Sequence, residues 1–379
     1  MIERKSVTTT KPRVQKLALT GGPGGGKTKL AKFIERKAVS KGYSVIVVPE
    51  AATLLMNSGL SPQGGRENLL NFQRAVLKET LFRERVGEKT LEESGHAKLL
   101  LLIDRGVRDI EAYVPADDAR VLLKECGFAH PAIARDTRYD AVLHMRTAAL
   151  GAEKFYSNKS NKRRSEDLDS ARALDQRTLE AWIGHQHLAI VGNTSYNSFR
   201  GKLEAGWREA CRLLGISKPR EIEKKFLVEP VDFDALGIPH RTIDIEQYYL
   251  ALSTSGDRVP RVRSWGEEGV ATHTFTEKRE IASGEVEEIE EPISETAFAH
   301  YTKYQKSGTV SIRKRRTCFV YEDQYFMYDE FLSGRQGLTL LEVELQSQDT
   351  PVILPPFVVV REDVSHNRDY FNSTIATIT

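Results

Sequence analysis

The stretch GGPGGGKT occupies residues 21–28 and directly follows the apolar run VQKLALT at residues 14–20. It fits the pattern G-x-x-x-x-G-K-[S/T], in which glycines let the backbone curl so that its N–H groups point at phosphate oxygens. Apolar residues at helical spacing follow at residues 27–40. A strand, a glycine-rich turn and a helix in this order place the positive end of the helix at a phosphate. The stretch therefore predicts a loop that holds the triphosphate of a nucleotide, ATP or GTP.

The residues of this loop have different expected roles. Lys27 is expected to reach the β- and γ-phosphates, and the Thr28 hydroxyl to ligate Mg²⁺ or Mn²⁺. The glycines expected to line the phosphates are Gly21, Gly22, Gly24, Gly25 and Gly26. A glycine-rich turn that binds nothing is the alternative.

Up to about residue 215, short β-rich apolar runs alternate with longer helical stretches, which is typical of parallel βαβ units. The expected strands are residues 14–20, 43–49, 98–104, 139–146 and 188–192, and the clearest helices are residues 27–40, 68–86 and 199–214. Five parallel strands between helices predict a doubly wound α/β domain.

Two acidic residues follow strands of this domain. Asp104 ends the third apolar run and Glu50 follows the second, so both are expected at the carboxyl edge of the sheet, where such folds bind ligands. Asp104 is a candidate metal-shell ligand or base, and Glu50 a candidate contact to a phosphoryl acceptor or to the metal shell. A helix cap for Asp104 and a solvated loop acid for Glu50 are the alternatives.

Further residues of this domain resemble a known group of proteins. They are Pro49 and Glu50, the sequence DRG at residues 104–106, Asp109, Tyr113 and the basic segment at residues 154–164. Together they resemble the nucleoside and nucleotide kinases, especially the ribosylnicotinamide-kinase-like, AAA-type group of P-loop proteins. That resemblance implies a basic lid with Arg163 and Arg164 at the triphosphate, and Asn193 near the base. A solvated, charged loop is the other interpretation of the lid segment.

After residues 215–219 the residue pattern changes to a period-2 alternation of charged and apolar residues, with turn-forming residues between the segments. The change predicts a P-loop domain at residues 1–217 and a second domain at residues 218–379. The expected strands of the second domain are residues 221–228, 242–252, 259–265, 273–281, 285–293, 310–319, 325–331 and 338–345. Eight antiparallel strands with one charged face predict a closed barrel lined by polar side chains and covered outside by a helix at residues 295–306.

The charged face carries both signs. Its basic residues are Lys225, Arg261, Arg263, Lys278, Lys314 and Arg316, and its acidic residues are Glu221, Glu223, Glu288, Glu290, Asp329, Glu342 and Glu344. Burying so many charges is costly unless they meet a partner. The basic side chains suit a linear triphosphate or polyphosphate, and the carboxylates suit one or two metal ions that position a water molecule. A solvated sheet face is the alternative.

The start of the second domain, E-x-E-x-K at residues 221–225, resembles the CYTH family of triphosphate tunnel metalloenzymes. This resemblance implies hydrolysis of a terminal phosphate, with Glu221, Glu223 and Lys225 in the catalytic set. The pairing of the two domains resembles two arrangements. One is a plant-type fusion whose relatives hydrolyse pyrophosphate or triphosphate. The other is the insect TRP-translocation-defect family, which is more similar at residues 19–23, 48–53 and 155–156; it binds GTP and phosphoinositides and supports membrane-protein traffic.

Two hypotheses about function result. The first is a Mg²⁺-dependent purine nucleoside triphosphate hydrolase or phosphotransferase with a triphosphatase-like second domain. The alternative is a GTP-regulated module that binds an inositol phosphate and turns over little. A net charge of +2 with 28% charged residues argues against a nucleic-acid partner. The polar amino terminus and the absence of an apolar run of about 20 residues predict a cytoplasmic protein, with peripheral membrane contact left open.

Overall fold

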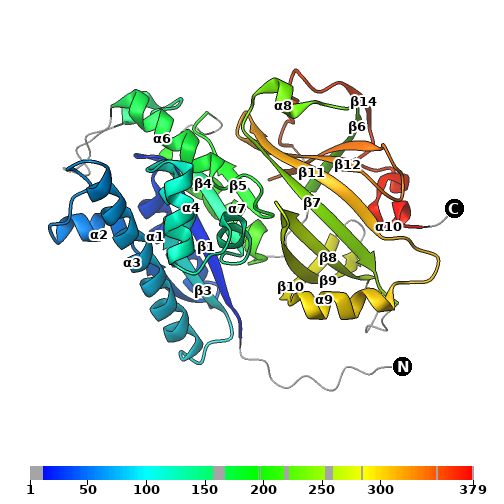
Figure 1. Ribbon diagram of the computed structural model, residues 1–379, viewed down its shortest axis with the longest axis horizontal. Helices are drawn as coiled ribbons and strands as arrows, with labels where there is room; N and C mark the ends of the chain where they lie inside the picture. Colours follow the sequence, from blue (N-terminus) through cyan, green and yellow to red (C-terminus); the bar gives the residue numbers. More distant parts are fainter. Residues whose placement is uncertain are drawn as a thin grey trace. The chain divides into compact units, whose positions relative to one another are not determined.

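The computed structural model describes residues 12–156, 167–194, 196, 198–216, 222–251, 259–282, 285–346 and 349–377, with the backbone alone at residues 259, 278–282 and 285–289. The chain divides into two compact units between residues 216 and 217. Each unit is built around its own sheet (Figure 1).

The described residues of the first unit form a five-stranded parallel sheet in the order β2-β3-β1-β4-β5 (Figure 1). Its strands are β1 (Val14–Thr20), β2 (Ser44–Val48), β3 (Leu99–Asp104), β4 (Ala141–Met145) and β5 (Leu188–Val191). Every residue of β3 is buried, as expected for an inner strand of a sheet covered on both faces. The doubly wound α/β class predicted for this unit is confirmed.

Helices connect these strands. They are α1 (Lys27–Val39), α2 (Ala51–Asn57), α3 (Arg66–Glu92), α4 (Ala116–Glu125), α5 (Pro131–Asp136), α6 (Leu168–Glu180) and α7 (Phe199–Leu214), with 3₁₀ helices η1 (Val107–Ala112) and η2 (Glu153–Phe155). Helices α1 and α7 share one apolar core with the sheet. A Cβ atom on Gly206 of α7 would lie 2.7 Å from a methyl carbon of Leu30 of α1, so glycine allows the two helices to pack closely. This contact sets how closely the middle of α7 approaches α1.

The described residues of the second unit form a nine-stranded sheet in the order β10-β9-β8-β7-β11-β12-β13-β6-β14, with antiparallel neighbours. Its strands are β6 (Ile222–Val228), β7 (His240–Tyr249), β8 (Val259–Glu267), β9 (Val270–Ala282), β10 (Glu285–Ile293), β11 (Ile312–Tyr321), β12 (Gln324–Phe331), β13 (Thr339–Leu345) and β14 (Val360–Asp363). Its helical elements are α8 (Phe233–Leu236), α9 (Glu295–Tyr301), η4 (Thr302–Tyr304), η5 (Arg368–Tyr370) and α10 (Asn372–Ile375).

The strand count corrects the prediction of eight. The additional strand, β14, is four residues long, and three of those residues are charged, so it lacks the alternation that revealed the others. Strands β10 and β14 end the order, and a ladder joining them, which a closed barrel requires, is not found among the described residues. The antiparallel class of the second unit is confirmed.

The two faces of the second sheet differ in polarity, as the alternation predicts. Phe226 of β6 belongs to an apolar cluster that also contains Phe233 of α8, whereas its neighbour Lys225 pairs with a carboxylate of β13. Helix α9 covers part of the sheet through Phe298 and Tyr301, which pack with Phe275 of β9. The helix predicted at residues 295–306 is therefore present as α9 and η4.

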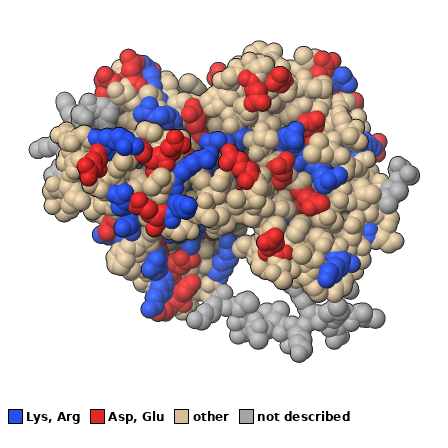
Figure 2. All heavy atoms as spheres, in the orientation of Figure 1, with Lys and Arg blue, Asp and Glu red and all other residues tan. Residues whose placement is uncertain are grey.

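Acidic and basic side chains lie interspersed on the face shown in Figure 2. The described residues of that face thus carry both signs of charge, in keeping with the small net charge of the chain. No helix within the described ranges combines the length and the apolar character that crossing a membrane requires.

Candidate functional site

The glycine-rich loop between β1 and α1 rests on the carboxyl end of β4. Gly21 and Gly26 have positive φ angles of 128° and 93°, which side-chain-bearing residues rarely adopt. A Cβ atom on Gly21 would lie 2.2 Å from the Met145 carbonyl oxygen, and one on Gly25 would lie 2.4 Å from the same atom. The loop can follow this path only with glycine at these positions.

Lys27 is buried and spans the loop. Its Nζ atom donates to the Gly21 carbonyl at 2.8 Å and to the Gly22 carbonyl at 2.9 Å. Burial and the nearby Arg105 lower the pKa of Lys27 to about 8, although Asp104 and Glu50 act in the opposite direction. The ammonium therefore lies inside the loop, where a phosphate oxygen could replace the two carbonyls.

Thr28 and Asp104 form a pair of oxygen ligands beside this ammonium. The Thr28 hydroxyl donates to Asp104 Oδ2 at 2.6 Å. Asp104 is buried, its Oδ1 atom has no hydrogen-bond partner among the described residues, and burial raises its pKa. A hydroxyl and a carboxylate oxygen with spare capacity suit a hard cation such as Mg²⁺, so these two residues fit the metal predicted here.

An ion-pair chain joins the end of β2 to the residues after β3. Arg105 Nε lies 2.5 Å from Glu50 Oε1, and Arg105 Nη1 lies 3.1 Å from Asp109 Oδ2. Burial would raise the pKa of Glu50, but Arg105, Lys27 and the Thr53 hydroxyl lower it to about 2. Arg105 has a positive φ angle of 76°. Glu50 is therefore anionic at neutral pH and is held in place from two sides.

A cavity of about 720 Å³ opens beside this chain of charges. It reaches Pro23 of the loop, and Glu50, Arg105 and Asp109 line it together with apolar side chains. Those apolar residues are Ala51, Ala52, Met56, Leu60, Leu69, Phe72, Val76, Leu77, Val107, Ile110 and Tyr113. The cavity has the volume and the mixed lining of a small-molecule site. Sequence reasoning missed it, since its walls come from α2, α3 and η1 and look like ordinary core positions.

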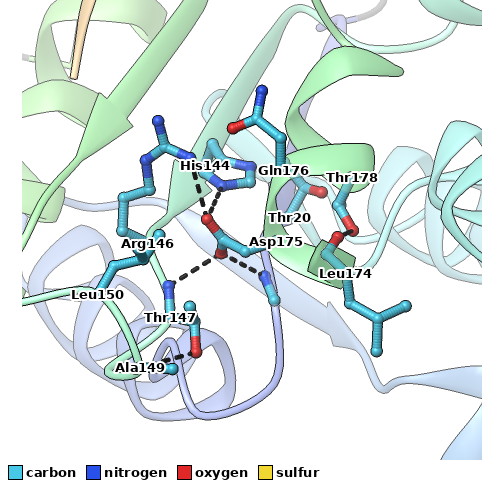
Figure 3. Close-up of polar contacts among 12 residues, drawn as sticks. Thr20, His144, Arg146, Thr147, Ala149, Leu150, Leu174, Asp175, Gln176 and Thr178 are labelled. Atoms are coloured by element: carbon cyan, nitrogen blue, oxygen red, sulfur yellow. Dashed lines mark hydrogen bonds and ion pairs between the residues drawn. The ribbon is translucent and has the colours of Figure 1, made fainter. Parts of the chain in front are cut away.

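Asp175 of α6 connects the loop to the end of β4 (Figure 3). Its Oδ1 atom accepts hydrogen bonds from the backbone N–H groups of Gly22 and Thr147, both at 2.8 Å. Its Oδ2 atom accepts from Arg146 Nη1 at 3.0 Å, and His144 Nε2 lies 3.3 Å away. Burial would raise the pKa of Asp175, but His144, Arg146 and the Gly22 amide lower it. One carboxylate thus fixes the loop backbone, and the sequence analysis did not select it.

Asn193, predicted near the base, supports the backbone after β4. Its Nδ2 atom donates to the carbonyls of Thr147 and Leu150 at 2.8 and 2.6 Å, and its Oδ1 atom accepts from Lys202 at 2.7 Å. These three bonds use both ends of the amide. The predicted lid residues Arg163 and Arg164 lie outside the described residues, as does Glu221, and so do the side chains of Lys278 and Glu288.

In the second unit the structure brings five predicted residues into one buried cluster. Lys225 Nζ lies 2.8 Å from Glu342 Oε1, and Arg316 Nη2 lies 2.5 Å from Glu342 Oε2. Asp329 accepts from Arg316 Nε at 2.7 Å and also from Lys314. Burial would raise the pKa of Glu342, but Lys225, Lys314 and Arg316 lower it. Three cations therefore pair with two buried carboxylates in one cluster.

The other predicted residues of this face are less tightly grouped. Glu223 Oε1 lies 3.8 Å from Lys225 Nζ, and Glu290 accepts from the Thr276 hydroxyl at 3.1 Å. Arg261 is buried, and Arg263 and Glu344 are half-buried. Within the described ranges no three His, Cys, Asp or Glu side chains gather closely enough to hold a metal ion.

A parallel sheet with a glycine-rich loop, a lysine and a threonine between β1 and α1 defines a P-loop nucleotide-binding domain. Residues 16–198 match the protein family described as AAA domain. No curated protein matches the chain.

Solved structures with similarity to the chain include an inorganic triphosphatase, with 25% identity over 42% of this chain and 95% of that one, at a TM-score of 0.31. A protein from Pyrococcus horikoshii OT3 and one from Pyrococcus furiosus are each 20% identical over 34% of this chain and 80% of their own, both at a TM-score of 0.26.

Proposed function

We propose that the first unit binds a purine nucleoside triphosphate with Mg²⁺ and transfers its terminal phosphoryl group to a small acceptor in the cavity, or to water. The observation that carries this proposal is the position of the cavity. It reaches Pro23 of the loop that contains Lys27, and the anionic Glu50 lines it. Phosphoryl transfer requires a donor and an acceptor side by side, and little covalent chemistry from the protein.

Each residue then has a definite role. Lys27 exchanges its two carbonyl partners for phosphate oxygens, and its charge offsets the charge that develops on the transferred group. Thr28 and Asp104 would hold Mg²⁺, which supplies charge neutralisation and orients the phosphates when bound. Glu50 is ionised and pinned by Arg105, so it accepts a hydrogen bond from the acceptor hydroxyl and orients that oxygen.

For the second unit we propose binding of a triphosphate, a polyphosphate or an inositol phosphate. Three basic side chains gathered on one face, Lys225, Lys314 and Arg316, support the binding of such an anion. Because Asp329 and Glu342 already pair with these cations, binding with little turnover is favoured over hydrolysis. A GTP-regulated module that binds phosphoinositides, as in the TRP-translocation-defect family, is therefore the second candidate function.

The test measures phosphate release from ATP, GTP and inorganic triphosphate with Mg²⁺, together with binding of triphosphate by calorimetry. Lys27→Ala should abolish nucleotide turnover, and Lys225→Ala should weaken the binding of triphosphate to the second unit. Nucleotide turnover that survives Lys27→Ala would refute the role of the first unit. Rapid triphosphate hydrolysis that is lost with Lys225→Ala would instead make the second unit an enzyme.

A further inference from the structure

An exposed aromatic ring lies against the phosphate-binding loop. Phe199 is the first residue of α7, and 44% of its surface is exposed. A Cβ atom on Gly26 would lie 2.8 Å from two ring carbons of Phe199, Cε2 and Cζ. The ammonium of Lys29 lies 5.1 Å from the centre of the same ring. The ring is therefore in contact with the loop while much of it still faces solvent.

The local packing holds this ring in place. The Ser198 hydroxyl caps α7 by accepting from the Gly201 amide at 3.1 Å, which fixes the first turn. Further along, Gly206 of α7 packs against Leu30 of α1. Because α1 begins at the loop itself, the ring and the loop belong to one packed body.

The ring of Phe199 lies on the side of the loop where the nucleoside of a bound nucleotide is expected. The cavity proposed for the phosphoryl acceptor reaches the loop at Pro23, whereas Phe199 touches it at Gly26, next to Lys27. A triphosphate whose terminal phosphate faces the cavity has its first phosphate, and the attached nucleoside, on the other side of the loop. That side is where Phe199 lies.

Two side chains among the described residues that precede Phe199 are engaged elsewhere. Asn193 uses its amide to hold the backbone after β4, and Tyr196 packs against the apolar core that α1 and α7 share. Exposed phenylalanine is unfavourable in water, and stacking on a flat heteroaromatic ring would remove this cost.

We propose that Phe199 is a base-binding residue, which stacks on the heteroaromatic base of the nucleotide whose phosphates occupy the loop. This inference rests on the proposed nucleotide binding of the first unit and adds the residue that recognises the nucleoside. A phenylalanine ring offers no hydrogen bond, so stacking does not by itself distinguish adenine from guanine. It does distinguish a nucleotide from inorganic triphosphate, which has no base.

Phe199→Ala tests the proposal, with Phe82→Ala as the matched control because Phe82 is an aromatic residue of α3 that is 59% exposed. Binding of radiolabelled GTP gives its Kd, and competition against that label by ATP and by inorganic triphosphate reports binding at the loop alone. The affinities for GTP and ATP should fall about tenfold in Phe199→Ala. The affinity for triphosphate should stay within twofold. Phe199→Trp should restore GTP binding, and Phe82→Ala should leave all three affinities unchanged.

Equal losses for nucleotides and triphosphate, or no loss for either, would overturn the stacking role of Phe199. A wild-type protein that binds no GTP would refute the proposed function, and the base-binding role with it. Restoration by tryptophan separates stacking from a folding defect, because a ring that merely fills space beside Gly26 would not accept a larger side chain without cost.

Discussion

Replacing Lys27 by methionine should make the stability of the first unit, in the absence of nucleotide, less dependent on pH. Burial lowers the pKa of Lys27 from 10.5 to about 8. That difference corresponds to about 3 kcal/mol of folding free energy lost at pH 7 by keeping the ammonium charged. The folded state binds fewer protons than the unfolded state between pH 8 and pH 10.5, so the free energy of unfolding rises with pH in this window. By pH 9.5 the wild type should recover about 2 kcal/mol of the loss.

Methionine has no proton to lose, so the stability difference between variant and wild type should shrink by about 2 kcal/mol from pH 7 to pH 9.5. Any weakening of the hydrogen bonds to Gly21 and Gly22 on deprotonation is part of the pKa of Lys27 itself, and the other effects of methionine do not depend on pH and cancel. Urea unfolding followed by tryptophan emission measures the difference. Trp265→Phe in both proteins would leave Trp182 and Trp207 of the first unit as reporters. A difference that stays constant from pH 7 to pH 9.5 would refute the lowered pKa of Lys27.

The remaining predictions concern single carboxylates. Asp175→Asn should weaken GTP binding about tenfold in calorimetry by loosening the loop, whereas Asp169→Asn on the same helix, with its side chain 91% exposed, should have no effect. Glu50→Gln should lower the rate of phosphoryl transfer at least tenfold while the Kd for nucleotide changes less than twofold. Since the pKa of Glu50 is about 2, the wild-type rate should not fall between pH 7 and pH 5 through protonation of Glu50. Glu342→Gln should destabilise the second unit by about 3 kcal/mol or more in urea unfolding, because it removes one partner of a buried charge cluster. The exposed Asp244→Asn should change stability by less than about 0.5 kcal/mol.

Local patterns were sufficient for much of the fold. The glycines at residues 21–28 predict the conformation of the loop, because only glycine fits where the chain passes the carboxyl end of β4. Alternation along each strand was likewise enough to find the charged face of the second sheet. It failed at β14, whose four residues are too few to show a period.

The residues that complete the site are those whose partners are distant in sequence. Asp175 and Gly22 are 153 positions apart, and an acid in the middle of α6 looks like any solvated helix residue. Resemblance predicts Asn193 near the base, whereas its hydrogen-bond partners at Thr147 and Leu150 depend on how β4 and β5 lie together. Such pairings exist only once the sheet has formed.

Arg105 places two opposing demands on one position. Its backbone angle suits glycine, since a left-handed conformation costs other residues roughly 1–2 kcal/mol. Its guanidinium holds Glu50 and Asp109 from two directions, which a lysine, with a single point charge, cannot reproduce. Glycine would remove the backbone strain but also both ion pairs. Lysine would keep the strain, and its ammonium could not bind both carboxylates from two directions. Position 105 should therefore tolerate almost no replacement, and a variant protein that loses this arginine should regain full activity only by reversion.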